Sequence, residues 1–192
     1  RTRAVVPDNL ELNFTLGQAY IQTRNAPGAR SALAKAFGVP ADSPAAHVVT
    51  AQLMIRLQNE ALAQAELQQA LARDPRTLRA NFLLGQIALF RGDLDAAVER
   101  SKGELALNPS DAMAFYQLGD ALQRQDRGDE AIDALQRSLW LNPFYSGPYI
   151  LLGRAYAKKG QLATAEGMLR RAIEYDPNNR AAHYLLAQLL QQ

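Results

Sequence analysis

The sequence predicts an all-α protein in which antiparallel helix pairs stack side by side into a solenoid. The deciding observation is a fixed period of about 34 residues, which indicates one helical unit copied several times. A single helix pair cannot bury its apolar side alone, so neighbouring pairs must stack. The positions that repeat at this interval are Leu84-Gly85, Leu118-Gly119 and Leu152-Gly153; Ala97, Ala131 and Ala165; and Pro75, Pro109, Pro143 and Pro177.

The period divides the chain into five complete units and two end segments. The complete units are residues 10–43, 44–77, 78–111, 112–145 and 146–179. We interpret residues 1–9 as the tail of a preceding unit, or else as an arbitrary terminus. Residues 180–192 are expected to form one further helix that caps the stack or begins a sixth unit. Because the chain starts with Arg1 rather than Met, we expect it to be a piece of a longer protein.

The first two units show how each helix is specified. Asn13, Gly17 and Tyr20 have the spacing of one helix face, which predicts that they face the partner helix. The second unit begins with Ser43, a suitable N-cap, followed by Pro44, which is favoured in a first helical turn.

The later units differ in regularity. The third unit turns at Gly92 and carries Gly103 in its second helix, where we expect looser packing because Gly costs roughly 1 kcal/mol against Ala. The fourth unit ends in the aromatic segment 140–145, and the fifth unit follows the period most closely. In the last helix, Leu186 is expected on the inner face.

The motif of the fifth unit resembles the tetratricopeptide repeat. Tyr149, Leu152-Gly153, Tyr156, Ala165 and Pro177 stand at that family's characteristic spacing. The resemblance covers nearly the whole chain. It implies a right-handed superhelix with a concave groove lined by the first helix of each pair, and it implies little about function.

Helical geometry locates the residues that would line such a groove. The face next to the one that packs on the partner helix carries an apolar or aromatic column, a polar column rich in Gln, and further cations. We call this set the predicted groove residues. They are Phe14, Gln18, Gln52, Arg56, Phe82, Gln86, Phe90, Tyr116, Asp120, Arg124, Ile150, Arg154, Lys158, Tyr184 and Gln188.

Two interpretations of these columns remain open. In one, the aromatic side chains anchor a bound peptide while polar groups beside them donate hydrogen bonds. In the other, the aromatic column packs against the next unit and the Gln column is ordinary solvated surface. The excess of cations favours an acidic peptide or a free carboxylate as the ligand. Chaperone-binding family members use Lys and Asn for such a carboxylate, whereas here the matching columns hold Phe14, Gln18, Val48 and Gln52.

Composition excludes several function classes at the level of sequence. The net charge of +2 is too small to predict nucleic-acid binding, and the absence of Cys removes disulfides and thiolate nucleophiles. No nucleophile–base pair or phosphate-binding loop is visible, so we expect no catalysis and no cofactor. No apolar run approaches the roughly 18 residues of a membrane span. Both cytoplasm and periplasm are compatible with this composition.

The leading hypothesis is therefore a non-catalytic scaffold that binds a protein or peptide in its concave groove. The first alternative is a substrate-presenting segment of a larger enzyme, since the family is often fused to glycosyl- or sulfotransferases. The second is an exported scaffold in envelope or polysaccharide assembly.

Overall fold

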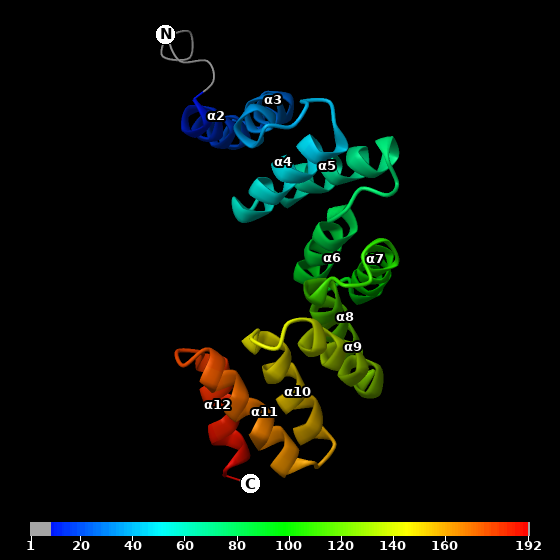
Figure 1. Ribbon diagram of the computed structural model, residues 1–192, viewed down its shortest axis with the longest axis vertical. Coiled ribbons are helices and arrows are strands. Elements are labelled where there is room, and N and C mark those ends of the chain that lie inside the picture. Colours follow the sequence, from blue (N-terminus) through cyan, green and yellow to red (C-terminus); the bar gives the residue numbers. More distant parts are fainter. Residues whose placement is uncertain (1–8, 192) are drawn as a thin grey trace. The chain divides into compact units, whose positions relative to one another are not determined.

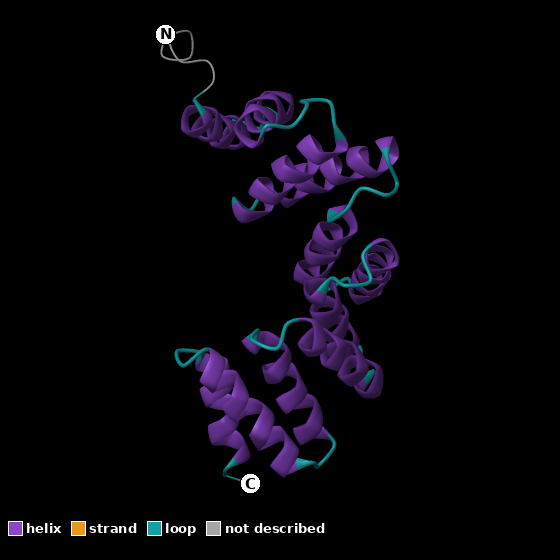
Figure 2. Cartoon of the chain, in the orientation of Figure 1, coloured by secondary structure: helices purple, strands orange, loops and turns teal. Residues whose placement is uncertain are grey.

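The computed structural model describes residues 9–191, and every element of regular structure within that range is an α-helix (Figure 2). The chain forms two compact units, Arg1–Ile87 and Ala88–Gln192. The all-α prediction is confirmed. Most of the predicted N-terminal tail, residues 1–8, lies outside the described residues. Asn9 is described, and its side chain caps the first helix by accepting a hydrogen bond from the Leu12 amide at 2.8 Å.

Two helix pairs make up most of the first unit. Within the unit α2 packs against α3, α4 against α5, and α3 against α4 (Figure 1). Ile21, Leu33, Met54 and Leu67 are fully buried between these helices. The helices are α2 (Leu10–Gln22), α3 (Ala26–Phe37), α4 (Pro44–Arg56) and α5 (Glu60–Arg73), followed by the start of α6 (Ala80–Arg91).

The second unit contains the end of α6 and six further helices. Here α8 packs against α9 and α10 against α11, while α10 also lies between α8 and α12. Leu135, Leu152 and Leu169 are almost completely buried. The helices are α7 (Leu94–Leu107), α8 (Ala112–Arg124), α9 (Gly128–Leu141), α10 (Ser146–Lys158), α11 (Leu162–Tyr175) and α12 (Arg180–Leu189).

Small residues allow the two helices of a pair to approach closely, as the repeat pattern predicts. A Cβ atom added to Gly119 would lie 2.6 Å from Cγ of Leu135, and one added to Gly153 would lie 2.7 Å from Cγ of Leu169. Both distances are too short for real carbon atoms, so these positions accept no larger side chain unless the helices shift. In these two pairs the glycine therefore sets the distance between the two helices.

The turn inside each helix pair has the same backbone conformation throughout. One residue per turn has positive φ, and the next amide donates a hydrogen bond to the carbonyl five residues earlier, which is the Schellman motif. The Asn59 amide, for example, bonds to the Met54 carbonyl at 2.8 Å. The positive-φ residues are Arg24 (57°), Gln58 (59°), Gly92 (77°), Asp126 (64°) and Gly160 (74°), each one period from the next.

Replacing Gln58 by Gly should stabilise the first unit. The left-handed conformation is unfavourable for a residue that carries a Cβ, and Gly adopts it without that cost. We expect Gln58→Gly to raise the free energy of unfolding by about 0.5–1 kcal/mol, measured by urea denaturation followed by circular dichroism. The control is Gln68→Gly in the helical part of α5, which should be destabilising. Equal effects of the two substitutions would contradict this account.

A buried polar network joins three helices of the first unit. The Arg30 guanidinium on α3 donates to both carboxylate oxygens of Glu66 on α5, at 2.9 and 3.1 Å. His47 Nδ1 on α4 lies 2.7 Å from Glu66 Oε2. Because an ionised carboxylate only accepts hydrogen bonds, Nδ1 must carry the proton. His47 is completely buried and its Nε2 has no partner among residues 9–191, so a second proton there would have nothing to bond to.

The stability of the first unit should depend on this histidine. Burial lowers the pKa of His47 below its usual 6.5, against the opposing influence of Glu66. The unfolded chain then binds a proton that the folded chain does not, so stability is complete above pH 6.5 and falls as the pH drops below that value. We expect the midpoint of urea-induced unfolding to decrease as the pH is lowered from about 6.5 to about 5, the range just below the usual histidine pKa. His47→Gln should remove this dependence of the unfolding midpoint on pH. If the variant keeps the same pH dependence, groups other than His47 cause it.

Candidate peptide-binding surfaces

The predicted groove residues of the first unit differ in exposure. Phe82 is buried, Phe14 and Gln18 are half-buried, and the other three are exposed: Gln52, Arg56 and Gln86. The buried position of Phe82 agrees with the packing interpretation of the aromatic column at that place. The polar column, in contrast, reaches solvent.

A cavity of the first unit brings together three of these residues from two different repeats. Phe14 comes from α2, while Gln52 and Arg56 lie one turn apart on α4. The cavity has a volume of about 210 Å³. Its complete lining is Phe14, Phe37, Val49, Gln52, Leu53 and Arg56.

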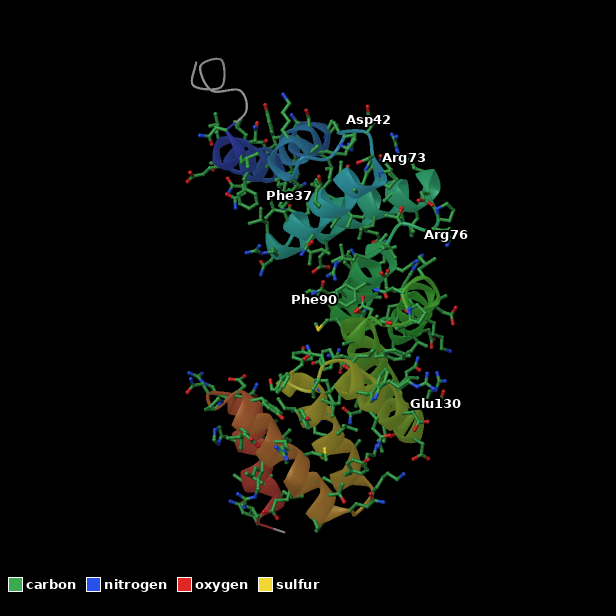
Figure 3. All side chains as sticks on the ribbon, in the orientation of Figure 1. Phe37, Asp42, Arg73, Arg76, Phe90 and Glu130 are labelled. Carbon is green, nitrogen blue, oxygen red and sulfur yellow. The ribbon has the colours of Figure 1, made fainter. Side chains whose placement is uncertain are left out.

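The aromatic wall of this cavity is an edge-to-face pair. The ring centroids of Phe14 and Phe37 are 6.3 Å apart with an interplanar angle of 69°. Phe37, the last residue of α3, is 52% exposed and is labelled in Figure 3. Sequence reasoning did not select it because it belongs to the second helix of its pair, where only the inner face was considered. Val49 and Leu53 were missed for a related reason, since they flank the predicted columns on α4.

Arg56 is the one charged residue in the lining of this cavity. Within residues 9–191 its guanidinium has no ion-pair or hydrogen-bond partner, and the side chain is exposed. An arginine at the edge of an apolar hollow can pair with a carboxylate in two-pronged geometry. The cavity therefore offers an apolar space next to an available cation.

The second unit has its own face of first helices, formed by α8, α10 and α12. Tyr116 on α8 contacts Tyr145, with ring centroids 5.1 Å apart, and burial raises the pKa of Tyr116. At the far end the Gln188 amide donates to the Tyr184 hydroxyl at 2.9 Å. Ile150 on α10 is half-buried.

Ion pairs within the second unit involve most of its predicted cations. Arg124 pairs with Asp120 at 3.0 Å and also donates to the Leu89 carbonyl at 3.3 Å. Lys158 pairs with Asp126 on the neighbouring repeat. Arg154 has no such partner in the part of the chain that the structure describes. The positive charge expected to attract an acidic ligand is thus partly neutralised here. The four-residue spacing of Asp120 and Arg124 on one helix already allows a pair, whereas the pair of Lys158 with Asp126 joins two repeats.

Phe90 is a further predicted groove residue of the second unit. It is the C-terminal aromatic of α6, belongs to the second unit and is 80% exposed (Figure 3). It is an exposed aromatic side chain on the same helix as Gln86.

Residues 9–191 show neither a cluster of metal-binding side chains nor a membrane-spanning helix. They contain no group of three or more His, Cys, Asp or Glu side chains placed to hold a metal ion. None of the described helices has the length and apolar character needed to cross a bilayer.

Family models match most of the repeated region. Tetratricopeptide repeat models match residues 51–101, 88–146 and 122–189. The chain belongs to the tetratricopeptide repeat family. This membership supports protein–protein interaction as its general role. No curated protein is similar enough in sequence to count as a match.

Solved structures of other tetratricopeptide repeat arrays have the same fold. A chain of the APC/C hetero-tetramer Cut9-Hcn1 is 22% identical with a TM-score of 0.77, and the match covers 98% of this chain but 37% of that one. PilF of Pseudomonas aeruginosa is 22% identical with a TM-score of 0.75, covering 95% of this chain and 83% of that one. A tetratricopeptide repeat protein of Thermus thermophilus is 22% identical with a TM-score of 0.69, and the match covers 96% of this chain and 100% of that one.

Proposed function

We propose that this protein is a non-catalytic scaffold that binds a peptide segment of a partner protein at the first-unit cavity. The observation that carries the proposal is the meeting of Phe14 with Gln52 and Arg56 around one hollow. These residues come from two repeats, and all three are among the predicted groove residues.

The cavity chemistry favours a ligand with an apolar side chain close to a carboxylate. The edge-to-face rings and Leu53 supply apolar surface, and removing such surface from water stabilises a complex by about 25 cal/mol per Å². Arg56 supplies donors that meet no carboxylate within residues 9–191. Gln52, one turn before it, can donate to or accept from a peptide backbone.

The cations of the second unit are expected to contribute less to the binding of an acidic ligand than Arg56 does. Arg124 and Lys158 already have acidic partners, so a ligand would have to compete with Asp120 and Asp126. Arg154 and the exposed Tyr184 remain accessible there. We therefore attribute the expected preference for an acidic ligand chiefly to Arg56.

The test is selection of a phage-displayed library of random 12-residue peptides on the whole chain, followed by fluorescence polarisation with the enriched peptides. Arg56→Gln should weaken binding about tenfold, as loss of a charged hydrogen bond does. Phe14→Ala should weaken it at least as much. Circular dichroism must show that both variants keep their helix content.

Arg76→Gln is the matched control, because it removes the same charge from the first unit at a residue outside the cavity lining (Figure 3). It should bind as the wild type does. If no enriched peptide loses affinity for Arg56→Gln or Phe14→Ala, this cavity is not a binding site.

A further inference from the structure

Trp140 is an exposed aromatic residue outside the predicted groove. It is the only tryptophan of the chain, lies near the end of α9 and is 84% exposed. Phe144, just beyond the helix, is 73% exposed. Large apolar side chains gathered on a surface mark interaction sites more often than isolated ones do. Because α9 is the second helix of its pair, this surface differs from the first-helix face described above.

A cavity of about 360 Å³ opens beside this tryptophan, within the second unit. Its lining comes from the α7–α8 turn, the first half of α8 and the last turn of α9. That volume lies near the lower end of the roughly 300–1,000 Å³ typical of ligand pockets. The lining residues are Pro109, Ser110, Phe115, Arg137, Trp140 and Leu141.

Arg137 is the one charged residue in this lining. Its guanidinium lies 5.8 Å from the centre of the Phe115 ring, and it has no carboxylate partner among the described residues. Asp133, one turn earlier on α9, is exposed and does not pair with it. A cation held against an aromatic ring keeps its outward N–H donors available.

The next repeat shows what is missing at this place. One period after Arg137 stands Arg171, and it pairs with Glu174 at 3.0 Å. One period after Trp140 stands the same Glu174. Trp140 therefore occupies the position that supplies the acidic partner of the equivalent arginine. The substitution removes that carboxylate and adds a large apolar surface beside the guanidinium.

We propose that the Trp140 cavity is a second docking site, which takes a peptide segment whose apolar side chain enters the cavity and whose carboxylate pairs with Arg137. The charge argument selects this ligand, because the cavity presents a cation that has no carboxylate partner among the described residues, whereas Arg171 of the next repeat has one. Its residues also match those that dominate binding energies at interfaces, which are enriched in Trp and Arg. The site lies entirely within the second unit and does not depend on the first-unit cavity.

The single tryptophan makes the site directly observable. Peptides enriched from a random 12-residue phage library on the whole chain are titrated while the intrinsic fluorescence of Trp140 is recorded, and tryptophan-containing peptides are set aside. We expect a class of peptides with an acidic residue near a large apolar one to change this fluorescence. Arg137→Gln should weaken their binding about tenfold, measured by fluorescence polarisation.

Trp140→Glu is the most specific variant, because it gives α9 the same arginine–glutamate spacing that Arg171 and Glu174 have on α11. It should abolish binding of this peptide class while leaving helix content unchanged, since position 140 is exposed. Trp140→Ala introduces the residue found one period earlier, Ala106, and should also abolish binding. Arg171→Gln is the matched control and should bind normally. Arg56→Gln should also bind normally, which separates this site from the first-unit cavity.

Three results would overturn the proposal. The first is that no enriched peptide changes Trp140 fluorescence. The second is that responsive peptides lack an acidic residue or bind Arg137→Gln normally. The third is concentration-dependent dimerisation in sedimentation velocity that Trp140→Ala abolishes, which would assign the surface to a second copy of the chain.

Discussion

The contact on which the α2–α3, α8–α9 and α10–α11 pairs depend is a leucine of the second helix packed directly over a glycine of the first. Leu33 lies over Gly17, Leu135 over Gly119 and Leu169 over Gly153, at distances that leave no room for a Cβ. Protein interiors are close-packed, so this contact fixes the separation of the two helices. Because the contact recurs at multiples of the sequence period, these three pairs share the same close helix spacing.

The turns act together with this packing. Each pair reverses direction through one residue of positive φ, and the following amide closes the helix end by a hydrogen bond. Gly fills that place in the third and fifth turns, whereas Arg24, Gln58 and Asp126 fill it elsewhere. The conformation is therefore imposed by the packing of the pair, and the local sequence only partly favours it.

Residues that differ from one repeat to the next form the buried polar network and the two candidate binding cavities. The first unit contains the buried Arg30–Glu66–His47 network, which we expect to make its stability sensitive to protonation. The two cavities described above each combine an aromatic wall with an arginine that has no acidic partner within residues 9–191. In a repeat array the shared positions maintain the fold, so binding specificity must come from positions that differ between repeats.

The sequence by itself determined the all-α fold, the family and the small residues at the helix contacts, because a strict period expresses local packing rules that each repeat obeys. It also selected Phe14, Gln52 and Arg56 as surface positions. Only the tertiary structure decided that these three meet around one cavity with Phe37, and that Asp126 pairs with Lys158 of the next repeat. Periodicity assigns a residue to a helix face, but ion pairs and cavities depend on side chains that meet across repeats.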